Sequence, residues 1–170
     1  MRLRTLCAPL AIAAAVAVTP LVATAQDAPT NPRFGKWLLA SEAASPSVNV
    51  MTYEAYGENG MKVTIQTFNG RGSFSQWGYV TNFVSGEFHP VDGREGSTSA
   101  VENMDATTTK ISNARNGVVT QVIMNRLTAN GDTIHNEYIS VNAEGEQTGS
   151  STASYVRIPQ GGGRRGGGGG

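Results

Sequence analysis

The sequence predicts an all-β protein, an up-and-down antiparallel β-barrel of about eight to ten strands. Short runs rich in Val, Thr, Tyr and Phe alternate apolar and polar residues, and no long apolar stripe with helical spacing occurs. Glycine-bearing turns separate the runs, and Asn-Gly or Asp-Gly supplies the positive φ angles of tight hairpins. Neighbouring runs should therefore pair antiparallel as a meander, and closure of the sheet would remove its exposed edges.

About ten strands are expected, each bounded by turn residues. They cover Gly35 to Leu39, Val48 to Tyr56, Met61 to Phe68, Phe74 to Phe83, Glu87 to Val91, Ser99 to Asn103, Thr107 to Asn113, Val118 to Thr128, Thr133 to Asn142 and Gly149 to Ile158. A two-sheet sandwich is the alternative architecture. Pairing between the strand of Trp37 and the final strand would distinguish the barrel from the sandwich.

The two ends of the chain differ in composition from the middle. Residues 1–25 are expected to be an export signal, with Arg2 and Arg4 before an apolar run and the small residues Ala23-Thr24-Ala25 before the cleavage site. The apolar run is too short to span a bilayer. Residues 26–33 are interpreted as a flexible linker, 34–159 as the β-barrel and 160–170 as a disordered Gly/Arg tail. We expect an exported, periplasmic or extracellular protein.

Composition excludes several kinds of function. The only cysteine, Cys7, would leave with the signal, so thiolate metal sites, disulfides and cysteine nucleophiles are not expected. Loss of Arg2 and Arg4 leaves 11 basic against 13 acidic side chains, which gives no reason to expect nucleic acid as a partner. His89 and His135 lack metal-binding spacing, and no serine lies in a nucleophile motif. We therefore predict no catalytic residue, metal or cofactor.

The period of two along each strand predicts which side chains point inward. In the fourth strand the aromatic row is expected inside: Trp77, Tyr79, Thr81 and Phe83. The rows expected inside the two preceding strands are Met51, Tyr53 and Ala55, then Val63, Ile65 and Thr67. The strands near 118–128 and 133–142 carry apolar groups on both faces, and our choice for the interior there is Met124, Arg126 and Tyr138.

Several segments together resemble a family of secreted, lipocalin-like bacterial proteins, related in pattern to lipocalins and fatty-acid-binding proteins. These segments are Phe34-Gly35-Lys36-Trp37, Met51-Thr52-Tyr53-Glu54-Ala55-Tyr56-Gly57, Lys62-Val63-Thr64, Trp77-Gly78-Tyr79 and Pro90-Val91-Asp92-Gly93. The resemblance implies that Gly35 and Trp37 form a structural plug at the closed end, with Arg157 lying over the indole. Only Ala40 to Ser47 separates the first two strands, so no helical lid is expected.

The candidate ligand-binding residues are Tyr53, Trp77, Tyr79, Phe83, Arg126, Tyr138, Tyr155 and Arg157. Tyr155 and Arg157 lie two apart on one strand face and could bind a ligand carboxylate. Alternatively, Arg157 stacks on Trp37 as a cation–π cap and Tyr155 fills the core. Arg126 would need a carboxylate partner if it points inward, and is a solvated charge if it points outward.

The function expected first is non-covalent binding of a small apolar or amphipathic molecule inside the barrel. A protein-interaction or inhibitor module with a packed interior is the alternative, and an isomerase or cyclase would need a pocket group with a perturbed pKa. A cavity of ~300 Å³ or more, lined by the aromatic row, would support binding. The sequence gives no indication of ligand identity or oligomeric state.

Overall fold

The computed structural model describes residues 31–41 and 47–159. The predicted export signal, residues 26–30 of the predicted linker, most of the connection between the first two strands and residues 160–170 lie outside this part. The described residues include no helix long and apolar enough to cross a membrane.

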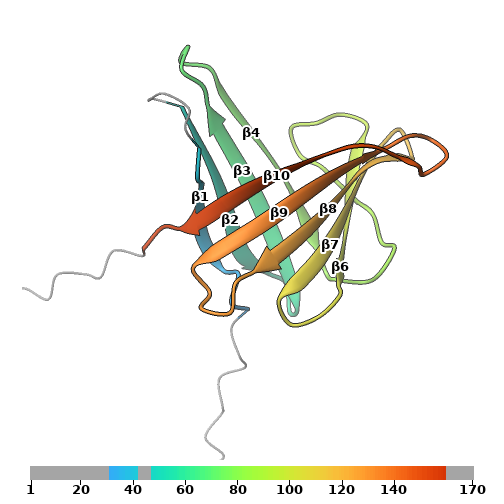
Figure 1. Cartoon of the computed structure of the whole chain (residues 1–170). Helices are drawn as coiled ribbons and strands as arrows, with labels where there is room; N and C mark the ends of the chain where they lie inside the picture. Colours follow the sequence, from blue (N-terminus) through green and yellow to red (C-terminus); the bar gives the residue numbers. More distant parts are fainter. Residues whose placement is uncertain (1–30, 42–46, 160–170) are drawn as a thin grey trace, which may run out of the picture.

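Ten antiparallel strands wind into one barrel, with β10 running beside β9 (Figure 1). The strands are β1 (Gly35–Leu39), β2 (Val48–Tyr56), β3 (Gly60–Phe68), β4 (Phe74–Thr81), β5 (His89–Pro90), β6 (Ser97–Asn103), β7 (Thr108–Arg115), β8 (Val118–Leu127), β9 (Thr133–Val141) and β10 (Gln147–Arg157). The predicted ranges for β1 and β2 agree residue for residue. The all-β fold class is confirmed.

Pairing between the first and last strands joins the two halves of the sheet. The order is β4-β3-β2-β1-β10-β9-β8-β7-β6-β5, with each pair antiparallel. Trp37 is opposite Arg157, and Leu39 is opposite Tyr155. This pairing confirms the up-and-down barrel, and the alternative of a two-sheet sandwich is wrong.

The seam of the barrel lies between β4 and the chain that leaves β5. Gly78 and Asp92 exchange two backbone hydrogen bonds there, with N···O distances of 3.1 and 2.8 Å. A Cβ on Gly78 would lie 2.4 Å from the Val63 carbonyl oxygen, and a Cβ on Gly93 would lie 2.6 Å from the Gln76 carbonyl oxygen. Glycine is required at both positions because the backbones approach so closely.

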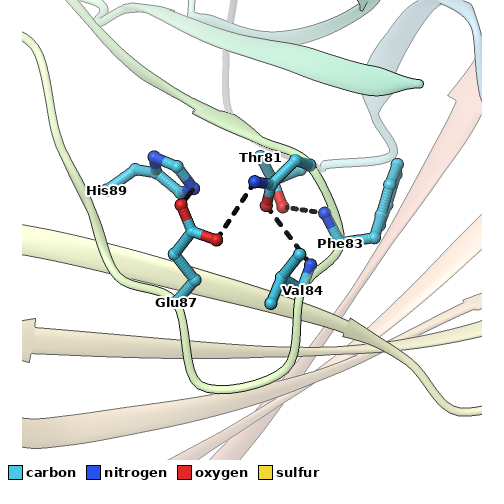
Figure 2. A network of polar contacts seen from close by, with 6 residues as sticks. Thr81, Phe83, Val84, Glu87 and His89 are labelled. Atoms are coloured by element: carbon cyan, nitrogen blue, oxygen red, sulfur yellow. Dashed lines mark hydrogen bonds and ion pairs between the residues drawn. The ribbon is translucent and has the colours of Figure 1, made fainter. Parts of the chain in front are cut away.

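The strand β4 ends two residues earlier than predicted, and Phe83 leaves the aromatic row. Figure 2 shows the loop that follows it, where the Phe83 N–H donates to Thr81 Oγ1 at 2.9 Å. The Val84 N–H donates to Asn82 Oδ1 at 3.3 Å. These side-chain acceptors replace strand partners, and the chain turns through Phe83 at φ 62°. Phe83 then packs against the core while half-buried.

Glu87 holds the two ends of the same loop together (Figure 2). Its Oε2 accepts a hydrogen bond from Asn82 Nδ2 at 3.1 Å, and its Oε1 lies 3.4 Å from His89 Nε2. The side chain of Glu87 therefore links the residue that follows β4 to the first residue of β5.

The interior rows match the predictions for β2, β3 and β9 except at one residue. Met51, Tyr53, Val63 and Ile65 are buried. Ala55 is exposed because it lies at the hairpin end of β2, beyond the core.

The predicted interior face of β8 is wrong. Ile123, Asn125 and Leu127 point inward, because the register places Asn125 opposite Asn136 and Leu127 opposite Ile134 on β9. Met124 and Arg126 consequently face outward. The guanidinium of Arg126 lies 3.2 Å from the Glu137 carboxylate on the exposed surface.

The closed end of the barrel is built on Trp37, which is 0% exposed. Its indole Nε1 donates to the Arg33 carbonyl oxygen at 2.9 Å. The guanidinium carbon of Arg157 lies 4.1 Å from the ring centroid. Arg157 also donates to the backbone carbonyls of Gly131, Phe34 and Pro32 at 2.8, 2.9 and 2.6 Å. Trp37 is thus buried with the Arg157 guanidinium stacked on its ring, and we call this end of the barrel the floor.

Replacing Arg157 with alanine should lower the free energy of unfolding by about 2–3 kcal/mol, because it removes charge-assisted hydrogen bonds and the cation–π contact. Arg126→Ala is the control, since it breaks an exposed ion pair that contributes about 0–1 kcal/mol. Urea unfolding of both variants measures the difference. Equal losses would contradict the structural role of Arg157.

Candidate functional site

An interior cavity of about 180 Å³ lies in the barrel, and we call it the chamber. The aromatic residues that line it come from β2, β4, β9 and β10: Tyr53, Trp77, Tyr79, Tyr138 and Tyr155. The aliphatic residues that line it come from β3, β7 and β8: Val63, Ile65, Ile111 and Ile123. The remaining predicted site residues do not line the chamber: Phe83, Arg126 and Arg157. Polar side chains, among them Asn49, Asn113 and Asn136, complete the lining, so the chamber combines apolar, phenolic and amide surface.

Arg33 reaches under the chamber, which the sequence analysis did not foresee. It is only 4% exposed, although its position before the first strand suggested a flexible linker. Its Nε donates to Asn125 Oδ1 at 3.1 Å, and its Nη2 donates to the Thr107 carbonyl oxygen. These acceptors lie far along the chain, so only the closed barrel brings them to Arg33.

A chain of hydrogen bonds leads from Arg33 to the phenols of the chamber. Asn125 Nδ2 lies 2.8 Å from Asn136 Oδ1 and 3.3 Å from the Tyr53 hydroxyl. Asn136 Nδ2 donates to the Tyr138 hydroxyl at 3.1 Å, and that hydroxyl lies 3.4 Å from the Tyr155 hydroxyl. Each buried polar group therefore has a partner within the network.

The charge of Arg33 is stabilised mainly by neutral acceptors. Burial lowers the pKa of Arg33, while the nearby charge of Asp105 opposes that shift. Hydrogen bonds from Thr107 and Thr108 hold the pKa of the Asp105 carboxyl at about 2, so Asp105 stays ionised. No described carboxylate lies within ion-pair distance of Arg33. The network is thus the main support of a buried guanidinium.

The phenols of the chamber are neutral hydrogen-bonding groups. Burial raises the pKa of Tyr53 to about 12, although the charge of Arg33 opposes the shift. Burial also raises the pKa of Tyr79 well above its ordinary value, and burial with the Tyr138 contact raises that of Tyr155. Among the described residues that line the chamber, none is a carboxylate or a histidine. The arrangement suits binding by shape and hydrogen bonds more than proton transfer.

Arg94 lies at the mouth of the chamber, and the sequence analysis also missed it. Its guanidinium carbon is 3.7 Å from the centroid of Trp77. Burial against the barrel lowers the pKa of Arg94. A tight turn holds the residue there, since its N–H donates to the Val91 carbonyl and its own carbonyl accepts from the Ser97 N–H. The sequence predicts a turn at Asp92-Gly93 but does not indicate that the turn packs against β4.

A second compartment of about 250 Å³ lies outside the mouth, and we call it the vestibule. It shares Trp77, Arg94 and Asn113 with the chamber. Its other lining residues are mainly polar and include Thr98, Arg115, Thr120 and Gln121. The stacked pair of Arg94 and Trp77 therefore lies on the boundary between an apolar space and a polar one.

Metal-binding geometry is not found in the part of the chain that the structure describes. No group of three or more His, Cys, Asp or Glu side chains there is close enough to hold a metal ion.

The barrel is similar to crystal structures of the fluorescent protein UnaG. The wild-type structure aligns with a TM-score of 0.50 at 14% identity and covers 74% of this chain and 96% of that chain. A single-residue variant aligns with a TM-score of 0.52 at 13% identity and covers 76% and 98%. At these identities the likeness supports the barrel fold alone. No protein-family model and no curated protein sequence matches the chain.

Replacing Asn125 with leucine should lower the free energy of unfolding by about 3 kcal/mol or more, because it removes the buried partners of Arg33 Nε and Asn136 Oδ1. Gln66→Leu is the matched control, since it breaks an amide pair of 2.8 Å on the exposed face of β3. Its loss should stay within about 0.5 kcal/mol. Urea unfolding gives both values, and similar losses would show that the buried network contributes no more than a surface bond.

Proposed function

We propose that this protein is an exported barrel that binds a small apolar or amphipathic molecule non-covalently. The observation that carries the proposal is the chamber, an aromatic and aliphatic cavity above a closed floor. Antiparallel barrels of this size commonly hold one small ligand, and the likeness to UnaG supports that architecture. The step from fold to binding is an analogy. The chamber supports that step because its lining residues could contact an apolar ligand.

The size of the chamber limits the ligand. At about 180 Å³ it is smaller than the ~300 Å³ expected for a drug-sized molecule. The vestibule adds a further 250 Å³ on the other side of Arg94. A ligand would therefore either be small or extend from the chamber past Arg94.

The alternative functions receive less support. A protein-interaction or inhibitor module with a packed interior does not require a chamber. An isomerase or cyclase would require a base near neutral pH, whereas the buried phenols have raised pKa values.

The proposal of export depends on the sequence of residues 1–25. A mature chain that begins near Gln26 in the periplasmic or culture fraction would support it, and mass spectrometry can measure that mass. An intact Met1 in the cytoplasmic fraction would contradict it.

The binding proposal can be tested with N-phenyl-1-naphthylamine, an uncharged aromatic probe that fluoresces in apolar sites. We expect saturable binding to the mature protein. Ile123→Phe should weaken it by about tenfold or more, because the larger ring fills the chamber. Val122→Phe is the control, since Val122 lies next along β8 on the outer face.

If Ile123→Phe and Val122→Phe weaken saturable binding equally, the probe binds outside the chamber. Absence of binding to the wild-type protein would contradict the proposed function. Urea unfolding of both variants establishes that they fold.

A further inference from the structure

We propose that the ligand is an amphipathic anion whose acidic group is bound by Arg94 at the mouth while its apolar body occupies the chamber. This inference rests on the proposed function and adds the chemical class of the ligand.

The first observation is the unused hydrogen-bonding capacity of Arg94. Its guanidinium contacts the face of Trp77 and has no hydrogen bond or ion pair to any described residue. Asp92 and Glu95 are near it in the sequence, yet neither carboxylate lies within ion-pair distance. A guanidinium has five N–H donors in a planar fork, which matches the oxygens of a carboxylate, sulfonate or phosphate.

The second observation is the sign of the charge around the mouth. Arg115 also lines the vestibule, and no described carboxylate lies within ion-pair distance of it. The residues that line the vestibule include two arginines and no acidic side chain. Hydroxyl and amide groups of Thr98, Thr120 and Gln121 complete a polar surface that can bind an anion.

The third observation is a polar group without a partner on the chamber wall. Asn49 lines the chamber, and its buried Oδ1 has no hydrogen-bond partner. A buried acceptor of this kind is costly unless a bound molecule or water donates to it. The chamber thus has unfilled hydrogen-bonding capacity in addition to that of Arg94 at its mouth.

Two further arginines, Arg33 and Arg157, are not available for an anion, whereas Arg94 is exposed. Arg33 donates to Asn125 and to the Thr107 carbonyl beneath the chamber. Arg157 donates to three backbone carbonyls on the floor. Arg94 differs from both because, among the described residues, its guanidinium contacts only the face of Trp77, which leaves its N–H donors accessible to an anion.

Backbone hydrogen bonds fix the turn that carries Arg94. The turn is held by the two hydrogen bonds between Gly78 and Asp92 and by the Asn116 N–H, which donates to the Gly96 carbonyl at 2.8 Å. The guanidinium is therefore presented from a fixed backbone at the boundary between the chamber and the vestibule.

A matched pair of probes tests the inference. 8-Anilino-1-naphthalenesulfonate carries the same aromatic body as N-phenyl-1-naphthylamine and adds one sulfonate. We expect Arg94→Met to lower the ratio of sulfonate-probe affinity to neutral-probe affinity by about tenfold, because it removes the charge and keeps an apolar stem over Trp77. Arg94→Lys should recover part of that ratio. In the wild-type protein, added salt should weaken binding of the sulfonate probe more than of the neutral probe.

Arg71→Met is the control, since Arg71 is an exposed arginine in the hairpin between β3 and β4. It should leave the ratio of affinities unchanged. An unchanged ratio in Arg94→Met, or an equal fall in Arg71→Met, would overturn the role of Arg94. Binding of the neutral probe would then still support the proposed function. If neither probe binds the wild-type protein, the proposed function and this inference both fail.

Discussion

Trp37 lies where β1 joins the two halves of the barrel. It pairs with Met51 on β2 and with Arg157 on β10, so its backbone connects both neighbouring strands. Its indole donates to the Arg33 carbonyl, and its ring faces the Arg157 guanidinium. The fully buried Trp37 thus contacts both Arg33 and Arg157, and it lies where the first and last strands pair. The closed floor of the barrel follows from this arrangement.

The charged and apolar groups of the interior are separated along the barrel. A buried guanidinium lies beneath the chamber, and neutral amides and phenols connect it to the chamber wall. Aliphatic side chains of β3, β7 and β8 line the rest of the apolar surface. At the mouth, Arg94 supplies a second positive charge that no described carboxylate neutralises. This distribution is the basis of the proposal that the ligand is apolar along its body and negative at the end near Arg94.

Local sequence patterns predicted most of the fold, because alternation and Asn-Gly turns act over a few residues. Asn116 and Gly117 adopt φ angles of 50° and 82°, as expected of a two-residue hairpin. The sequence does not predict which face of β8 points inward, because both faces carry apolar residues. The register between β8 and β9 determines that face. Arg33 and Arg94 were missed for a related reason. Each contacts residues far along the chain, which nothing in the local sequence identifies.

Hydrogen exchange of the two indole N–H groups tests the arrangement of a closed floor and an accessible mouth most directly. The Trp37 N–H is buried and bonded to a carbonyl, whereas the half-buried Trp77 has no hydrogen-bond partner among the described residues. Nitrogen-15 NMR, with Trp77→Phe to assign the signals, should show Trp37 exchanging only through global unfolding and Trp77 exchanging rapidly. Equally fast exchange of both would contradict the closed floor.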